Sequence, residues 1–161
     1  MIKSVNKTTS KMKDDFIRIL TNDDKIVELL DNPSVETGDE LINKNIFSWL
    51  KINFTVSEVG TYIGLKVDYP SITSNKAIKN YNLTFLILSH NKHMPLRVGG
   101  NRADALAQRI IELFNFNNSL GYTLALSSDV EDPYNTDFYY RKLKFVSETT
   151  NSIPNILNNG M

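Results

Sequence analysis

The sequence predicts an α+β fold, in which a mostly antiparallel sheet carries one long amphipathic helix packed across it. Two short N-terminal helices and an extended C-terminal arm complete this fold class. Several segments alternate polar and apolar residues, as half-buried strands do. One stretch, residues 101–115, repeats apolar side chains every three or four positions, as an amphipathic helix does. A doubly wound nucleotide-binding fold requires strands and helices that alternate regularly along the chain, and this sequence lacks that alternation.

The composition is that of a single globular domain. The chain has 161 residues, of which 41% are hydrophobic and 22% charged, and this balance excludes wholesale disorder. Its 18 basic and 18 acidic residues cancel, so strong nucleic-acid binding driven by bulk charge is not expected. The absence of cysteine excludes disulfides, thiolate zinc sites and cysteine nucleophiles. We expect one domain over residues 1–146 and a polar arm over residues 147–161.

Targeting signals are not expected in this sequence. The basic N-terminus is not followed by the apolar core of a signal peptide. The longest apolar runs are far shorter than a membrane span. We therefore expect an intracellular location, or a particle that is assembled inside the cell.

Residues 8–30 predict two short helices, because their apolar residues recur at spacings of three and four. Asp23 has the side chain of a helix N-cap and stands where the second helix begins. Pro33 ends that helix, since a residue before proline avoids the helical conformation. Residues 31–45 then predict a polar, turn-rich connection.

Residues 46–146 predict the sheet and its helix. The segment 81–89 is apolar on both faces for part of its length, which favours a central strand. A polar linker over residues 71–80 precedes it, and an acidic turn over residues 129–133 separates the last two strands. The predicted strands are 52–56, 61–69, 81–89, 122–127 and 136–146.

The long helix over residues 101–115 has the clearest pattern. Gly99 and Gly100 let the chain turn before it, Asn101 is a good N-cap, and Asp104 lies in the first turn. One stripe of this helix is apolar, and much of the other side is polar, with Arg102, Gln108, Arg109 and Glu112.

The two histidines, His90 and His93, are three residues apart. That spacing could chelate a metal on a helix, but this segment follows a strand and has no third ligand nearby. We therefore expect two ordinary loop histidines, and a metal or pH role is the weaker alternative.

Four acidic residues gather near the last two predicted strands. Val130 and Pro133 stand where a calcium-binding loop needs an oxygen ligand and a glycine, so we expect a solvated hairpin turn. The paired carboxylates of a nuclease are the less favoured alternative. The four residues are Asp129, Glu131, Asp132 and Asp137.

The glycine pair before the long helix invites comparison with a phosphate-binding turn. The full glycine-rich patterns of such turns are missing, and Arg97 and Arg102 alone do not supply them. We therefore attribute Gly99 and Gly100 to the needs of a turn and a helix cap.

Two further groups of residues have a plain interpretation and a functional one. The basic N-terminus is a solvated end, or an arm that contacts an acidic partner or nucleic acid. Clustered aromatic residues pack on a sheet face, or they stack bases. We favour the plain interpretation for both groups, which are Lys3, Lys7, Lys11 and Lys13, and Tyr134, Phe138, Tyr139 and Tyr140.

The residues therefore predict no catalytic, cofactor-binding or metal-binding site, and we expect that the chain is not an enzyme. An assembly or binding role fits this pattern, because such proteins need surface and shape more than titratable groups.

Three stretches resemble the tail terminator and tail-completion proteins of tailed bacteriophages. They are residues 80–88 (NYNLTFLIL), 102–115 (RADALAQRIIELFN) and 137–145 (DFYYRKLKF). The resemblance covers about residues 45–146. The N-terminal helices ahead of LLDNPS also resemble neck proteins of phages that infect low-GC Gram-positive bacteria, and nineteen asparagines fit an AT-rich genome.

The resemblance implies a structural virion protein of the phage neck, assembled in the host cytoplasm. It implies a hexameric ring that terminates the tail tube and joins it to the head connector, with DNA passing through it. The implied partners are other copies, the tail tube protein and head-connector proteins, with no membrane. We expect residues 70–80 and 147–161 to make these contacts, because they are polar and not needed for the core.

Other functions fit the same residues less well. The chain could form another neck ring, such as a head-completion or connector protein. It could instead be a small regulatory module that binds protein or nucleic acid. An enzyme with an unusual site is the third alternative.

Overall fold

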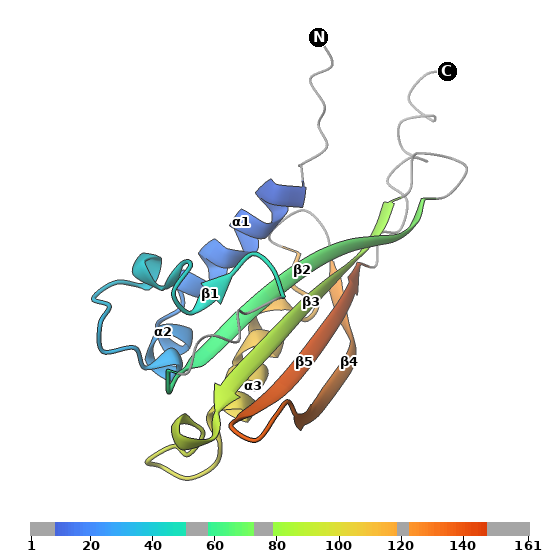
Figure 1. The fold of residues 1–161 in the computed structure, drawn as a ribbon. Coiled ribbons are helices and arrows are strands. Elements are labelled where there is room, and N and C mark those ends of the chain that lie inside the picture. Colours follow the sequence, from blue (N-terminus) through green and yellow to red (C-terminus); the bar gives the residue numbers. More distant parts are fainter. Residues whose placement is uncertain (1–8, 51–57, 73–78, 119–122, 148–161) are drawn as a thin grey trace, which may run out of the picture.

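The computed structural model describes residues 9–50, 58–72, 79–118 and 123–147 (Figure 1). Helices lie against one face of a twisted five-stranded sheet in this part of the chain. In chain order its elements are α1 (Thr9–Thr21), α2 (Asp24–Leu30), η1 (Gly38–Leu41), β1 (Ile46–Phe47), β2 (Thr61–Ile72), β3 (Lys79–His90), η2 (Asn91–His93), α3 (Arg102–Phe114), β4 (Leu124–Pro133) and β5 (Phe138–Ser147).

The sheet has the strand order β1-β2-β3-β5-β4. The short strand β1 pairs with β2 in parallel, and the other neighbours pair antiparallel. β3 lies in the centre, as its two apolar faces predict, and the pairs Leu65–Phe85 and Phe85–Leu143 set its register with both neighbours. β1 and β4 therefore form the two edges of the sheet.

The predicted fold class is wrong in two respects. The sheet is mixed, because the connection after η1 brings β1 in parallel to β2. Among the described residues no single long helix crosses it: α1 and α3 have 13 residues each, and α1 packs on β2 while α3 packs on β3, β4 and β5. A helix is about 10–12 Å across, whereas five strands at about 4.8 Å spacing span about 20 Å. One helix is therefore too narrow to cover this face of the sheet, and α1 and α3 share it.

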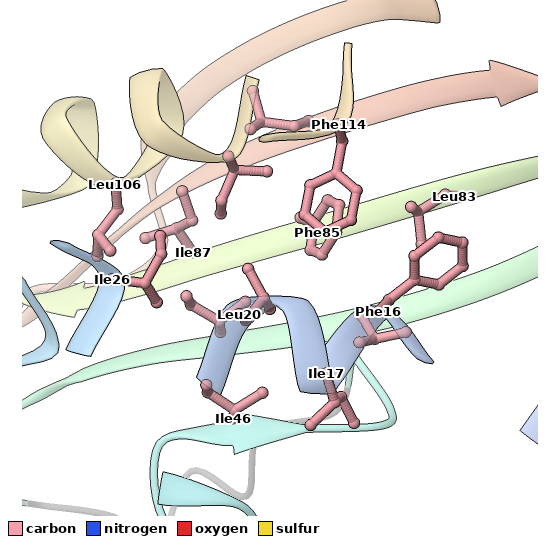
Figure 2. Close-up of a cluster of buried hydrophobic side chains, with 14 of the residues drawn as sticks. Phe16, Ile17, Leu20, Ile26, Ile46, Leu83, Phe85, Ile87, Leu106 and Phe114 are labelled. Atoms are coloured by element: carbon pink, nitrogen blue, oxygen red, sulfur yellow. The ribbon is translucent and has the colours of Figure 1, made fainter. Parts of the chain in front are cut away.

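The main core lies between these helices and the sheet (Figure 2). Phe114 of α3 has its ring 5.0 Å from that of Phe85 and 5.8 Å from that of Phe16, so it joins both helices to the central strand. Phe145 of β5 packs edge-on against Phe85, with ring centroids 6.0 Å apart. All four rings are buried. Burial of this apolar surface provides the main favourable term of folding.

The predicted helix caps are confirmed. The side chain of Asp23 accepts a hydrogen bond from the Ile26 backbone N–H at 3.0 Å, which caps α2. Asn101 accepts one from the Asp104 N–H at 2.7 Å and donates its amide to the Asp104 carboxylate at 2.6 Å. The first of these bonds satisfies one orphan backbone N–H group at the start of α3, and the second holds the two side chains together. The two expected N-terminal helices are also both present, as α1 and α2.

The structure corrects three strand boundaries. β2 continues to Ile72 after an irregularity between Asp68 and Ser71, and β3 begins at Lys79, so the linker predicted over residues 71–80 is shorter. β4 includes residues 129–133, which the sequence predicts as a turn. Its acidic side chains are compatible with a strand because β4 is an exposed edge. The strand predicted over residues 52–56 lies outside the described residues.

Candidate functional site

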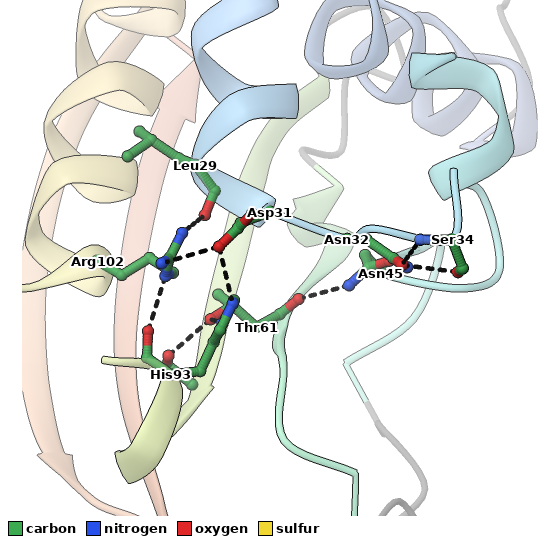
Figure 3. Close-up of polar contacts among 9 residues, drawn as sticks. Leu29, Asp31, Asn32, Ser34, Asn45, Thr61, His93 and Arg102 are labelled. Carbon is green, nitrogen blue, oxygen red and sulfur yellow. Dashed lines mark hydrogen bonds and ion pairs between the residues drawn. The ribbon is translucent and has the colours of Figure 1, made fainter. Parts of the chain in front are cut away.

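A buried arginine stands at the centre of a polar network beside the end of β3 (Figure 3). Arg102, the first residue of α3, is only 7% exposed. Its guanidinium donates to the carbonyl oxygen of Leu29 at 2.5 Å and to that of His93 at 2.7 Å, and it contacts the Asp31 carboxylate at 3.4 Å. One side chain thus ties the C-terminal end of α2 to η2 and α3. Arg102 is therefore buried, and its predicted place on the polar side of the helix is wrong.

A chain of side chains continues from Asp31 into the sheet. The Asp31 carboxylate lies 3.6 Å from Nε2 of His93, whose Nδ1 is 2.8 Å from the Thr61 hydroxyl. That hydroxyl lies 2.7 Å from the hydroxyl of Ser89. The order carboxylate, imidazole, hydroxyl is that of a hydrolase triad. Thr61 and Ser89 are 0% exposed, however. In this conformation these linked side chains hold β2, β3 and η2 together and present no hydroxyl to a substrate.

The charge state of His93 follows from its surroundings. Burial is the main cause that lowers the pKa of His93 below its ordinary value, and the charge of Arg102 acts in the same direction. Asp31 opposes both, but its side chain is 64% exposed and is screened by solvent. The imidazole is therefore held neutral, with one nitrogen toward Thr61.

A polar pocket opens beside this network. Asn45 is buried, donates to the Thr61 carbonyl oxygen at 2.9 Å, and accepts from the Asn32 amide at 2.6 Å. The pocket has a volume of about 260 Å³. Among the described residues, no group of three histidine or acidic side chains is arranged to hold a metal ion. The lining of the pocket contains residues of both charges and neutral residues: Asp31, Asn32, Pro33, Ser34, Lys44, Asn45, Glu58, Val59, Gly60 and Tyr62.

The two histidines differ from the ordinary loop residues that the sequence predicts. His90 is the last residue of β3 and is 8% exposed. Its Nδ1 accepts from the Lys92 N–H at 3.1 Å, and its ring meets that of Phe138 edge-on at 5.0 Å. His93 belongs to the Arg102 network. Both histidines therefore fix the chain where β3 ends.

The acidic residues near the last two strands divide into two groups. Arg141 of β5 contacts the Asp129 carboxylate through two hydrogen bonds of 2.7 and 2.8 Å, and it also pairs with Glu131 and with Asp104 of α3. Asp129 is the main cause that raises the pKa of Arg141 above its ordinary value. Asp132 and Asp137 are exposed and take no part in these pairs. The prediction of a solvated turn thus overlooks a bridge between β4, β5 and α3.

The glycine pair makes the turn that the sequence predicts. Gly99 and Gly100 have φ angles of +93° and +81°, in the region that favours glycine. The Leu96 N–H donates to the Gly100 carbonyl oxygen at 3.2 Å, and the Gly99 N–H donates to that of Leu96 at 3.1 Å. The result is a tight loop with Arg97 and Val98 at its tip.

The N-terminal lysines and the aromatic residues are only partly described. Lys3 and Lys7 lie outside the described residues, whereas Lys13 of α1 donates to the Ser48 carbonyl oxygen at 2.8 Å. The aromatic residues of β5 do not form one surface. Phe138 and Tyr140 belong to a small cluster on the sheet face away from the helices, Tyr139 packs against the main core, and Tyr134 is 43% exposed.

A family model described as YomW matches residues 13–147, which is most of the chain. The chain belongs to the YomW family. YomW is a phage-associated family. No curated protein matches the chain at a significant level.

The YomW match includes the Arg102 network, the Arg141 bridge and the β2–β3 hairpin. It leaves out the arm predicted over residues 147–161 except for Ser147, the last residue of β5. Within the described part of this YomW-family chain, no helix is long and apolar enough to cross a bilayer. The phage association agrees with the phage origin that the sequence resemblance implies, and it specifies no place in the particle.

Proposed function

We propose that this chain is a structural protein of the phage virion, forming a ring in the neck that terminates the tail tube and joins it to the head connector. The phage-associated family and the sequence resemblance to tail terminators support this function. The main structural support for this function is a hairpin that projects beyond the sheet, because a ring subunit needs an extended surface to contact its neighbours.

The projecting hairpin is formed by β2 and β3 (Figure 1). β5 pairs with β3 only as far as the Asn82–Val146 pair, whereas β2 and β3 remain paired at Ser71–Asn80 and Ile72–Lys79. The two strands therefore run about 10 Å past their last pair with β5, at about 3.3 Å per residue. We assign to this hairpin the contact that the sequence predicts for residues 70–80, of which 73–78 lie outside the described residues.

The rest of the described chain provides a stiff base for such a hairpin. The Arg102 network ties α2 and α3 to the lower ends of β2 and β3, and the Arg141 bridge ties α3 to β4 and β5. A ring subunit must transmit force from one neighbour to the next without deforming. We include the segment 148–161, which lies outside the described residues, as a second contact.

The proposed mechanism is mechanical. Copies of the chain close a ring through a heterologous interface, in which each subunit contacts its two neighbours through different surfaces. The ring binds the last ring of tube protein, stops polymerisation, and offers its other side to the head connector. DNA passes through the ring.

Assembly of the tail tube protein of the same phage tests this function. Tubes grown with the chain should stop at a short length and carry a ring at one end in electron micrographs, whereas tubes grown alone should continue to lengthen. A variant that lacks residues 71–80 and is closed by Asn-Gly should fold but not arrest growth. Tubes that lengthen equally with and without the wild-type chain would overturn the proposal, and salt-dependent retention on DNA would favour a nucleic-acid-binding module instead.

A further inference from the structure

We propose that the Arg97–Val98 loop of one copy docks into a groove between α1 and η1 of the next copy, and that this contact closes the ring. The inference rests on the proposed function and deepens it, because it adds to the β2–β3 hairpin two further surfaces that meet in the heterologous interface. We call the loop over residues 94–100 the knob and the groove beside α1 the α1 groove.

The knob exposes an apolar side chain on a firmly held turn. Val98 is 95% exposed, the most of any large hydrophobic residue that the structure describes. The turn is closed by the Leu96–Gly100 hydrogen bond and by a bridge between Pro95 and Asn101. Behind it, Arg102 holds the carbonyl oxygen of His93. A held loop loses little conformational entropy on binding, which favours its use as a contact.

The α1 groove offers the complementary surface. Its volume is about 470 Å³, it has Ile17 and Ile42 as apolar walls, and Ile42 is 40% exposed. Asp14 and Asp39 also line it, and neither makes an ion pair within the described residues. Arg18 and Thr21 complete the lining. The groove therefore combines an apolar interior with two unpaired acids and one base.

The knob and the groove match in shape and charge. The groove has room for Val98 against its two isoleucines, and the exposed cation of Arg97 would lie between the carboxylates of Asp14 and Asp39, which make no ion pair within the described residues. Opposite charges across an interface steer association and fix its register. Arg18 would stay at the edge of the groove, where solvent screens its repulsion of Arg97.

The positions of the two surfaces favour a contact between copies. The knob lies beside Glu28 and Leu29 at the C-terminal end of α2, whereas the groove includes Thr21, just before the N-terminal end of that helix. Figure 1 shows the loop after β3 and the segment around η1 on opposite sides of α2. One copy therefore presents the knob and the groove in different directions. Such a head-to-tail contact closes into a ring when the rotation between copies permits it.

Substitutions that reverse the charges of Arg97 and Asp39 test this contact. The mass of the assembly would be measured by light scattering across a range of protein concentrations, with and without the tail tube protein. Arg97→Glu and Asp39→Arg should each raise the concentration for half-assembly at least about tenfold. The double variant Arg97→Glu/Asp39→Arg should restore it to within about threefold of wild type. Val98→Asp should also prevent assembly, and because Arg97 and Val98 are exposed, these loop variants should keep the wild-type unfolding temperature.

Lys92→Glu is the matched control for Arg97→Glu. It changes the net charge equally at an exposed position near the knob, and it should leave assembly unchanged. If the Arg97→Glu and Val98→Asp variants form rings as the wild type does, the proposed contact is overturned and the proposed function still stands. Loss of assembly in both single charge variants without recovery in the double variant would show that the knob binds a different partner. A wild-type chain that stays monomeric even with tube protein would contradict both proposals.

Discussion

Asp23 and Arg109 join two helices through a residue that also caps one of them. Arg109 of α3 donates to both carboxylate oxygens of Asp23, at 3.1 Å to Oδ1 and 2.6 Å to Oδ2, while Oδ1 also accepts from the N–H of Ile26 in the first turn of α2. The Asp23 side chain is 11% exposed. The hydrogen bond from Arg109 is the main cause that lowers the pKa of Asp23. One carboxylate thus stabilises α2 and fixes it against α3.

Substitutions at Asp23 should separate these two roles. Asp23→Ala removes the cap and the ion pair, and loss of the cap alone should lower the free energy of unfolding by about 1–2 kcal/mol. Asp23→Asn keeps an oxygen for the Ile26 N–H and should cost less. Urea unfolding followed by circular dichroism measures both changes. Equal losses in the two variants would show that the ion pair, and not the cap, carries the stability.

The pKa of Asp23 also predicts a dependence on acid. Because the folded pKa lies below the unfolded value near 3.9, the stability from Asp23 is fully present above that value. It is lost as the pH falls through the lowered pKa of the folded state. Between pH 5 and pH 2, Asp23→Asn should therefore lose less stability than the wild type does, as measured by urea unfolding at each pH.

Replacement of Arg102 should be more damaging than replacement of an exposed arginine. Arg102→Met leaves the carbonyl oxygens of Leu29 and His93 without their donor, and it should lower the free energy of unfolding by about 3 kcal/mol. Arg102→Lys should fall between this variant and wild type, because an ammonium group lacks the planar fork. Arg97→Met, at an exposed position, is the control and should change stability by less than about 0.5 kcal/mol. A neutral Arg102→Met would contradict the role of this network.

His93 should make the protein less stable in mild acid. Since its folded pKa lies below the unfolded value near 6.5, its contribution to stability is fully present above pH 6.5. This contribution is lost as the pH falls from there toward the lowered folded pKa. Thermal unfolding at pH 7.5 and at pH 5 should show a smaller difference for His93→Gln than for wild type. An unchanged difference would show that other groups cause the pH dependence.

Gly64 should be needed for the path of the chain across β2. A Cβ atom at Gly64 would lie 2.6 Å from the carbonyl oxygen of Trp49 and 3.2 Å from Cα of Leu50, closer than packed atoms approach. Gly64→Ala should therefore displace this segment and move the emission of Trp49, the single tryptophan. Gly99→Ala, whose Cβ meets no atom within 4 Å, is strained only in its backbone and should leave that emission unchanged.

The sequence predicts those parts of the structure that depend on neighbours in the chain. The caps at Asp23 and Asn101 bond to residues three positions away, so local spacing reveals them. Arg102 is missed because its partner Leu29 is 73 residues away, and no local pattern distinguishes a buried arginine from a solvated one. Residues 129–133 of β4 are predicted as a turn because Arg141, the partner of Asp129, lies on the next strand.

The fold class fails for a similar reason. β1 has only two residues, too few for an alternating pattern to show, yet its parallel pairing with β2 makes the sheet mixed. The division of the helical layer between α1 and α3 depends on contacts such as that between Phe16 and Phe114, which are far apart in the sequence. Periodicity predicts each helix but not how many helices share one face of the sheet.

If this chain is part of the phage neck, it must lie at the junction of head and tail in the particle, and its position there can be measured. Antibody against the chain, visualised with gold in electron micrographs, would be applied to intact particles of the phage that encodes it and to particles dissociated at the junction of head and tail. The proposal predicts gold at that junction and at the head-proximal end of isolated tails. Particles that carry no label in either preparation, with the chain found only in the unassembled lysate, would contradict it.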